Sequence, residues 1–382
     1  MIYKFGQLFE IIDGDRGKNY PGDSDFFDEG YCLFLNAGNV TKSGWSFESN
    51  AFIAKEKDEQ LRKGRVNRGD TVFTTRGTVG NAAYYGDKVP FDNIRINSGM
   101  VILRPKDEAI VDNEFIYYLV TSPLAKKTIE LYCSGSAQPQ LPIKDFVKIK
   151  YDLPSIAKQR QIVSVLNSFD NLIEVNNKRI KVLEQMAENL YKEWFVRFRF
   201  PGHESVPFEN GLPKGWKPCK LSELFDVRYG KEHKEIGDGQ IPIFGSGGIM
   251  RYGDQALYAG ESVLIPRKGT LNNIMYYNGP FWTVDTMFYT VLLKDNLAKY
   301  AYFTLKNVDM ESYNSGAALP SMTTDILYHL KIIVPDDNTL EWFDRFIDGV
   351  FKQTEAVKKL NENLIRQRDL LLPRLMSGKL EV

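Results

Sequence analysis

The sequence predicts an α+β protein that contains one unit twice. Each copy is an α/β domain followed by a long helix, and the two helices pair as an antiparallel coiled coil in a pseudo-twofold internal repeat. Two observations predict this fold: loop motifs recur in the same order in both halves, and a heptad-spaced segment ends each half. At 382 residues the chain is also too long for one small domain.

Three pairs of motifs identify the internal repeat. Near the start of each half, Leu8-Phe9 with Gly14 matches Leu224-Phe225 with Gly230. A strand-like segment and the Arg-Gly-Thr loop after it (69–78) recur at 260–270, where Lys268 is interpreted as one extra residue. A loop rich in Gly and Ser (134–139) recurs at 315–320. Three pairs in the same order indicate a duplication.

The first part of each half combines strand-like segments with short helices, separated by Gly, Asn and Pro turns. Strands are expected at Thr71–Thr74, Met100–Leu103, Ser262–Ile265 and Met287–Val291, and short helices at Glu114–Val120, Leu124–Leu131 and Leu297–Leu305. Prolines at 154 and 335 open the long helices, and Pro201-Gly202 ends the first one. We therefore divide the chain into residues 1–153, 154–200, 201–334 and 335–382.

The two segments that end the halves have the 4,3 spacing of coiled-coil a and d positions. Each predicted helix has about 33 residues, or roughly 50 Å at 1.5 Å per residue. Equal length and matched phase favour pairing over separate packing of each helix on its own domain. The expected contact residues are Ile162, Leu166, Phe169, Ile173, Asn176, Ile180, Leu183, Leu190, Phe343, Ile347, Val350, Val357, Leu364 and Leu371. Thr354, Asn361 and Arg368 interrupt the second pattern and leave its register open.

Charge and cysteine content restrict the class of protein. The 49 Lys and Arg residues balance 49 Asp and Glu residues, which argues against a simple basic tail that binds any polyanion but permits a local basic groove. The three cysteines lie far apart without metal-ligand spacing, and the first residues contain no apolar signal segment. We therefore expect a reduced, cytoplasmic protein that makes no membrane contact.

Residues for catalysis form no recognisable motif. The sequence has no Walker loop, no Asn-Pro-Pro-aromatic segment that would hold a flipped adenine, and no glycine fingerprint for an adenosyl cofactor. His203, His233 and His329 are scattered, and Asp336 with Asp337 fits the acidic start of a helix. We expect no catalytic, cofactor or metal site in this chain.

The recurring loops supply candidate DNA contacts. Glycines let backbone amides approach a phosphate, hydroxyl groups donate to it, and Arg, Asn and Gln side chains recognise base edges. Ordinary charged turns are the alternative, and recurrence in both halves favours binding for the Arg-Gly-Thr loop. For the loop rich in Gly and Ser, drift of a structural loop stays equally open, and for the early loops charged surface is the default explanation. In the first half the candidates are Arg76, Gly77, Thr78, Gly80, Asn81, Ser134, Ser136, Gln138, Gln140, Arg16 and Lys18. In the second half they are Arg267, Lys268, Gly269, Thr270, Asn272, Asn273, Ser315, Ser321, Arg228 and Lys231.

Three further motifs, together with the internal repeat, carry a resemblance to a known family. The sequence resembles the specificity subunits of type I restriction–modification systems over essentially its whole length. Residues 153–163 (LPSIAKQRQIV) resemble the start of that family's first spacer helix. Residues 212–216 (LPKGW) resemble the start of a target-recognition domain, and residues 371–380 (LLPRLMSGKL) the usual end of the chain. The first half departs from the pattern, because it lacks the Pro-Lys-Gly-Trp motif, so its first strand is expected to be shorter or supplied otherwise.

The resemblance implies that residues 1–153 and 201–334 are target-recognition domains, each recognising one half of a bipartite double-stranded DNA target. Residues 154–200 and 335–382 would then be the central and C-terminal spacer helices, which set the spacing and dock two methyltransferase subunits. It also implies that S-adenosylmethionine, ATP and Mg²⁺ belong to partner subunits, namely the methyltransferases and the restriction/translocase subunits. Two alternatives stay open: a specificity subunit for a combined methyltransferase–nuclease, and a coiled-coil adaptor that binds no DNA.

Overall fold

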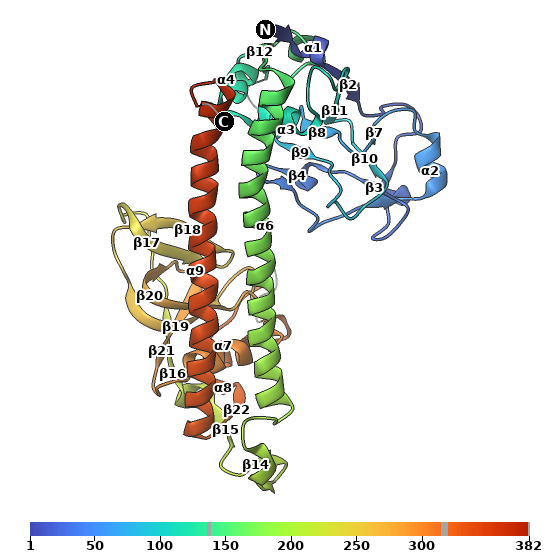
Figure 1. Cartoon of the computed structure of the whole chain (residues 1–382). Helices are drawn as coiled ribbons and strands as arrows, with labels where there is room; N and C mark the ends of the chain where they lie inside the picture. The colour runs from blue at the N-terminus through green and yellow to red at the C-terminus, as the bar shows by residue number, and fades with distance from the viewer. Residues whose placement is uncertain (136–138, 315–319, 381–382) are drawn as a thin grey trace. The chain divides into compact units, whose positions relative to one another are not determined.

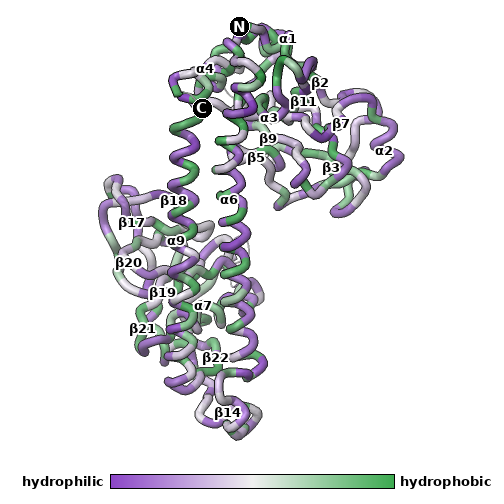
Figure 2. Tube along the Cα trace, viewed as in Figure 1, coloured by the Kyte–Doolittle hydropathy of each residue, from purple (hydrophilic) through white to green (hydrophobic). Residues whose placement is uncertain are grey.

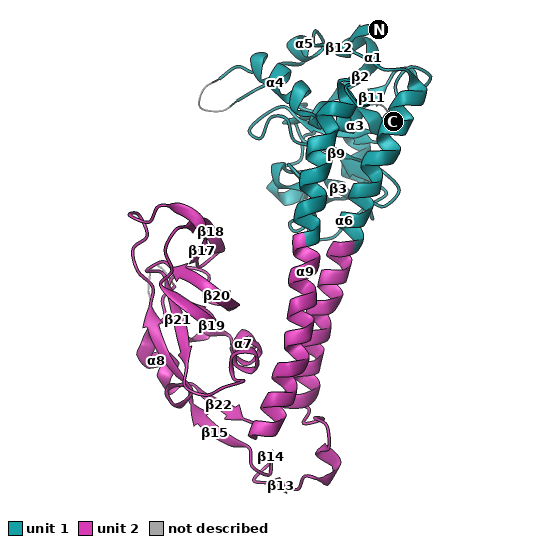
Figure 3. Cartoon of the chain, turned by 60° about the vertical axis from the view of Figure 1, so that its left-hand side comes forward, with its two compact units in different colours: residues 1–175, 360–382 teal, residues 176–359 magenta. Residues whose placement is uncertain are grey.

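The computed structural model describes residues 1–135, 139–314 and 320–380 (Figure 1). Contacts divide the chain into unit 1 (residues 1–175 and 360–382) and unit 2 (residues 176–359), coloured separately in Figure 3. The division falls within both long helices, α6 (Ile156–Tyr191) and α9 (Asp337–Met376), so each helix contributes to both units. The division into four segments at residues 153, 200 and 334 stays a prediction.

Unit 1 contains two four-stranded sheets, ordered β2-β11-β8-β9 and β6-β3-β10-β7, and two short pairs, β1-β12 and β4-β5. Its strands are β1 (Ile2–Lys4), β2 (Phe9–Asp13), β3 (Cys32–Phe34), β4 (Val40–Thr41), β5 (Gly44–Trp45), β6 (Phe52–Ile53), β7 (Arg65–Val66), β8 (Thr71–Thr74), β9 (Ala82–Tyr84), β10 (Ile94–Arg95), β11 (Met100–Pro105) and β12 (Lys150–Asp152). Its short helices are α1 (Phe5–Leu8), α2 (Lys55–Gln60), α3 (Asn113–Thr121), α4 (Pro123–Leu131) and α5 (Ile143–Phe146).

Strand β11 is buried on both faces, which explains its run of apolar residues. Val101 and Leu103 pack in one core with residues of α3, whereas Met100 and Ile102 pack in a second core with the β3 and β10 strands. Successive side chains of a strand point to opposite faces of the sheet. The first sheet therefore lies between a helical layer and the second sheet.

Unit 2 contains one six-stranded sheet, ordered β16-β21-β19-β20-β17-β18, and the short pairs β13-β14 and β15-β22. Its strands are β13 (Phe208–Glu209), β14 (Leu212–Pro213), β15 (Lys217–Lys220), β16 (Phe225–Tyr229), β17 (Asp238–Gly245), β18 (Gly248–Gly253), β19 (Tyr258–Pro266), β20 (Met275–Thr283), β21 (Met287–Leu292) and β22 (Lys331–Val334). Its short helices are α7 (Ala298–Lys306) and α8 (Thr324–His329). The four expected strands and three expected short helices are confirmed in the two units, with ends shifted by a few residues.

The strand that opens each domain is present in both units. In unit 1, β1 pairs antiparallel with β12 through three residue pairs, and in unit 2, β15 pairs with β22 through four. The first strand of the first half is thus present and pairs within its own unit, with one residue pair fewer than in unit 2, and the Leu153 amide also donates to the Met1 carbonyl (2.9 Å).

The predicted a and d residues form the contact between α6 and α9 in each unit. In unit 1, Ile162 and Leu166 share a core with Leu372 and Leu375. In unit 2, Leu183 and Ala187 share a core with residues 343, 347 and 350 of α9. None of the predicted contact residues on either helix is exposed, and hydrophobic and hydrophilic residues alternate along both helices (Figure 2). The coiled-coil prediction is confirmed within each unit.

Cross-helix pairs show that the helices run antiparallel in both units. In unit 1, the Tyr151 hydroxyl, just before α6, donates to the Met376 carbonyl (2.9 Å), and Asp170 pairs with Arg368 (2.6 Å). In unit 2, the Trp194 and Phe343 rings lie 5.8 Å apart. Lys358 lies 3.9 Å from Glu184 in the same unit.

The polar residues that interrupt the second heptad pattern also lie in the contact. Thr354 and Asn361 are 6% and 7% exposed, and the Thr354 hydroxyl donates to the Val350 carbonyl (2.9 Å). The ion pair with Asp170 shows why the a/d pattern tolerates Arg368.

The long helices lie slightly inside the predicted segments 154–200 and 335–382, and at 36 and 40 residues they are a little longer than the expected helices. The first starts at Ile156 and its α-helical part ends at Tyr191, followed by a π-helical turn at Lys192–Val196. Among the described residues, no helix has the length and apolar character needed to cross a membrane.

Candidate nucleic-acid interface

Two of the predicted loops lie side by side in unit 1. Loop A (residues 75–81) follows β8, and loop B (residues 134–135 and 139–141) follows α4. Arg76 forms an isolated β-bridge with Gln140, and the Gly77 amide donates to the Pro139 carbonyl (3.3 Å). The Leu141 amide donates to the Thr75 carbonyl (2.9 Å). Two motifs about 60 residues apart in the sequence thus form one surface.

The same arrangement occurs in unit 2, between residues 267–273 and 320–322. Lys268 bridges Ser321, the Gly269 amide donates to the Pro320 carbonyl (3.1 Å), and the Met322 amide donates to the Arg267 carbonyl (2.8 Å). The hydrogen bonds match those of unit 1 one by one, which confirms the predicted equivalence of Pro139 and Pro320, whereas residues 136–138 and 315–319 lie outside the described residues.

This match corrects the alignment of the first loop. The Thr75 amide donates to the Gly99 carbonyl and the Arg267 amide to the Thr286 carbonyl, both at 2.8 Å. Arg267 therefore occupies the position of Thr75, and Lys268 the position of Arg76. The interpretation of Lys268 as an extra residue is wrong, because pairing of two arginines by identity shifts the strand register by one residue.

A third loop lies against residues 97–99 in unit 1 and against residues 283–284 in unit 2, and a glycine fixes its position in each unit. A Cβ atom on Gly14 would lie 2.2 Å from the Asn97 carbonyl oxygen, and one on Gly230 would lie 2.0 Å from the Val284 carbonyl oxygen. No other residue fits such a close backbone approach. The predicted equivalence of Gly14 and Gly230 is confirmed, and the loops after them (14–18 and 230–234) carry Arg16, Lys18 and Lys231.

The loop at 14–18 is held by a buried carboxylate. Asp15 is 6% exposed and accepts hydrogen bonds from the backbone amides of Gly17 and Arg62, both at 2.7 Å. These two bonds hold the pKa of the Asp15 carboxyl below its ordinary value. Arg16 donates to the Ser98 carbonyl (3.2 Å) and pairs with Asp13 (3.1 Å), which directs it toward the 97–99 segment.

Several candidate side chains are exposed at these loops. Arg76, Lys18, Thr78, Ser134 and Gln140 are exposed in unit 1. Arg228, Lys231 and Thr270 are exposed in unit 2, where Arg228 pairs with Asp226 (2.8 Å). Arg267 is half-buried, donates to the Asp285 carbonyl (3.1 Å) and lies over the Tyr229 ring (5.3 Å).

Three asparagines among the candidates are occupied by structural hydrogen bonds. The Asn81 amide donates to the Val40 carbonyl (3.1 Å), and the Asn273 amide donates to the Ser246 carbonyl (2.7 Å). Asn272 donates to Asp309 (3.3 Å) and accepts from the Met310 amide (2.8 Å). These bonds give each asparagine a role in shaping its loop, and their part in DNA contact stays a prediction.

The remaining candidates divide into backbone positions and residues outside the described part of the chain. Gly77, Gly80 and Gly269 shape the loops through left-handed backbone conformations with φ of 72°, 96° and 85°. Ser321 is half-buried. Ser136, Gln138 and Ser315 lie outside the described residues.

The sequence carries no repeated motif for two further segments of this surface. Residues 97–99 contact loop A and the 14–18 loop, and residues 61–64 contact the 14–18 loop through Asp15. Both contacts join segments far apart in the chain, so periodicity and local motifs contain no signal for them.

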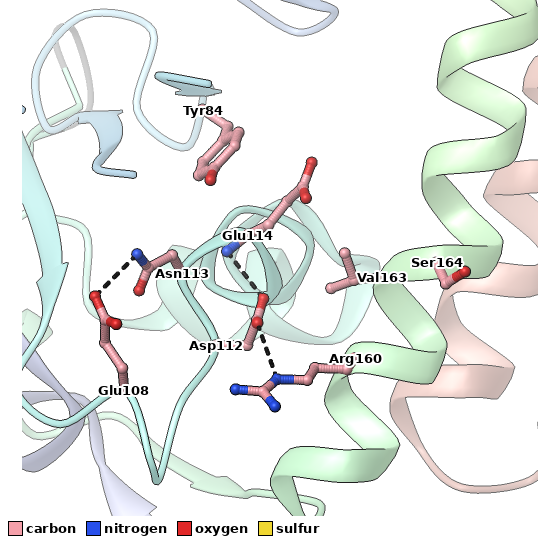
Figure 4. Close-up of a pocket in the computed structure, with 8 residues that line it drawn as sticks. All are labelled: Tyr84, Glu108, Asp112, Asn113, Glu114, Arg160, Val163 and Ser164. Atoms are coloured by element: carbon pink, nitrogen blue, oxygen red, sulfur yellow. Dashed lines mark hydrogen bonds and ion pairs between the residues drawn. The ribbon is translucent and has the colours of Figure 1, made fainter. Parts of the chain in front are cut away.

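A polar pocket of about 370 Å³ lies between α3 and the start of α6 in unit 1 (Figure 4). Asp112 caps α3 by accepting from the Glu114 amide (3.1 Å) and lies 3.8 Å from Arg160 of α6. Burial raises the pKa of Glu114, and Glu108 also lines the pocket. Three carboxyl groups beside one arginine disfavour an anion, so we place no DNA phosphate here.

Histidine, cysteine and acidic side chains are the residues that could hold a metal ion, and the expectation of no metal site stays a prediction. Within the described part of the chain, no group of three or more His, Cys, Asp or Glu side chains is arranged to hold a metal ion. Cys32, Cys133 and Cys219 are free, and Cys32 and Cys219 are buried.

Comparison with known proteins places the chain among DNA specificity proteins. The family described as type I restriction modification DNA specificity domain matches residues 1–185 and 213–366. The chain is 25% identical to the MjaIX specificity subunit of a type I restriction enzyme from Methanocaldococcus jannaschii, over 82% of this chain and 78% of that protein. It is 19% identical to the HindI specificity subunit from Haemophilus influenzae, over 96% and 98% of the two chains.

A solved structure has the same fold. The S subunit of a type I restriction–modification system from M. genitalium superposes with a TM-score of 0.60 at 17% identity, over 98% of this chain and 95% of that one. Because the family match spans most of both halves and the fold agrees, this chain belongs to the family of type I restriction–modification DNA specificity domains.

Proposed function

We propose that this chain is the DNA sequence-recognition subunit of a type I restriction–modification complex, and that each unit recognises one half of a bipartite target. The observation that carries this proposal is the pair of equivalent loop surfaces with different side chains. Arg76 and Gln140 in unit 1 correspond to Lys268 and Ser321 in unit 2. A shared scaffold with different side chains suits two different half-sites, because side-chain identity determines which base edges are contacted.

The paired helices are proposed to set the distance between the half-sites. Helices of 36 and 40 residues correspond to roughly 54 and 60 Å at 1.5 Å per residue. One turn of duplex DNA is about 34–36 Å long. Two recognition domains joined by such helices would therefore contact half-sites more than one turn of the duplex apart.

The proposal assigns no catalytic step to this chain. Methyl transfer, with S-adenosylmethionine, would belong to two methyltransferase subunits docked on the helices and adjoining surfaces. ATP and Mg²⁺ would belong to restriction/translocase subunits. The zero net charge of the chain supports a need for partners, because DNA affinity depends strongly on contacts between cations and phosphates.

A gel-shift assay with and without the cognate methyltransferase tests this function. The complex is expected to bind a target duplex selectively and the lone chain weakly. Lys268→Ala in the complex should weaken binding and relax selectivity in one half-site, by ~1–3 kcal/mol if Lys268 contacts a base. Lys331→Ala removes an exposed charge elsewhere in unit 2 and should have little effect. Capture of the partner without any DNA selectivity would support the adaptor alternative instead.

A further inference from the structure

Residues 61–64 form an exposed basic segment of unit 1 next to the proposed interface. Arg62 is 79% exposed and Lys63 is exposed, between the buried residues Leu61 and Gly64. Leu61 packs in a small core with Cys32, Phe34 and Ile53. The two charged side chains therefore project from a segment that is anchored on both sides.

A buried arginine, Arg95, binds the backbone of this segment on the side that faces the core. Arg95 is 4% exposed and forms an ion pair with Asp58, which is fully buried. Its guanidinium donates to the carbonyls of Asp58 (2.7 Å), Leu61 (3.0 Å) and Lys63 (2.6 Å). Such a clamp fixes the direction in which Arg62 and Lys63 leave the surface, and a preorganised contact loses less entropy on binding.

A continuous series of hydrogen bonds connects residues 61–64 to the proposed DNA-contacting loops. Asp15 accepts from the Arg62 amide (2.7 Å), and the Ile96 amide donates to the Gly64 carbonyl (2.9 Å). Arg16 donates to the Ser98 carbonyl (3.2 Å), and the Thr75 amide donates to the Gly99 carbonyl (2.8 Å). Residues 61–64, 14–18, 97–99 and 75–81 thus form one continuous strip, which we call the basic strip.

The basic strip is positive although the chain as a whole is neutral. It contains five cations, Arg16, Lys18, Arg62, Lys63 and Arg76, and one carboxylate, Asp15. Asp13, next to the strip, pairs with Arg16, and the Arg62 guanidinium lies 3.9 Å from the Asp15 carboxylate. Within the described residues, Lys18, Lys63 and Arg76 form no ion pair. Phosphates of a duplex are the polyanion that such a row of cations suits.

We propose that Arg62 and Lys63 contact DNA phosphates and that they extend the interface of unit 1 beyond the recurring loops. This inference rests on the proposed function and adds to it a positioning contact that is independent of sequence. Phosphate contacts fix the register of a protein on the duplex, whereas base contacts specify the sequence. Arg95 is a positioning residue in this arrangement.

The test is the double variant Arg62→Ala with Lys63→Ala, in the complex with the methyltransferase subunits. Binding is measured against a duplex that carries the motif methylated in the host and against a scrambled duplex of equal length. We expect roughly tenfold weaker binding to both duplexes with an unchanged ratio between them. The slope of log affinity against log salt should become shallower by about 1.8, or ~0.9 for each lost contact.

Two matched variants make the result specific. Lys127→Ala with Lys150→Ala removes two exposed charges from the same unit, outside the basic strip, and should change the salt slope little. Arg62→Lys should retain most of the affinity, because an ammonium replaces a guanidinium at a phosphate better than at a base.

The outcomes separate this inference from the proposed function. If the unsubstituted complex shows no preference for the target duplex, the proposed function fails. If it shows that preference but the Arg62/Lys63 variant behaves like the Lys127/Lys150 variant, the phosphate contact is overturned while the function stands. A loss confined to the target duplex would also overturn it, because that result indicates base recognition.

Discussion

At the scale of single residues, the proposed interface depends on a buried carboxylate within a surface of cations. Asp15 joins the 14–18 loop to the 61–64 segment through the amides of Gly17 and Arg62. Simple electrostatics predicts that a negative charge here weakens DNA binding. The hydrogen bonds predict the opposite, because they join the 14–18 loop to the 61–64 segment and hold the cations of the two segments in a defined arrangement.

We therefore expect Asp15→Ala to lower the affinity of the complex for its target, although the change makes the surface more positive. Gel-shift titration of both proteins gives the comparison, and tighter binding by the variant would refute the positioning role.

The lowered pKa of Asp15 also has a consequence for stability. Its contribution is present above the pKa of the unfolded carboxyl, about 3.9, and is lost as the pH falls through the folded value. Asp15→Ala should reduce this acid-dependent loss in unfolding measurements.

Residues at this scale could be predicted from the sequence in part. The internal repeat of the sequence identified Gly14, Gly230 and the two recurring loops. Close backbone packing and loop pairing require these residues, so both halves contain them in the same order. The equivalence of Lys268 with Arg76 could not be obtained in that way, since strand register depends on hydrogen bonds to residues such as Thr286. Arg95 beneath the 61–64 segment is likewise a contact between distant parts of the chain.

At the scale of elements, heptad spacing predicted the contact between α6 and α9 well. The a and d positions became the buried face even where they are polar, as Thr354 and Asn361 show. The sequence predicted this because helix periodicity alone determines which side chains share a face. It could not predict the pairing of Arg368 with Asp170, which depends on the register between two helices.

Phe343 and Phe346 provide a matched test of the helix contact in unit 2. Phe343 is fully buried and its ring lies 4.7 Å from the Phe195 ring, whereas Phe346 on the same helix is 50% exposed. Phe343→Ala should lower the free energy of unfolding by about 3–5 kcal/mol, because it leaves a cavity in the core. Phe346→Ala should change it by less than ~1 kcal/mol. Denaturant titration of both variants measures the difference, and equal losses would contradict the assigned contact face.

At the scale of the whole molecule, duplication gives one chain two related recognition surfaces. Each unit has its own cores and its own set of loops, and the loops differ where side chains face solvent. Such a molecule is expected to specify a target with two unlike halves. The bases themselves depend on contacts with DNA, which neither the sequence nor the loop backbone defines.

The most direct test of this account is methylome sequencing of a host that expresses the chain together with its methyltransferase partner. We expect one new methylated motif made of two different half-sites, separated by a spacer of fixed length and unspecified sequence. A continuous motif without a spacer, or no methylation that depends on this chain, would contradict the account.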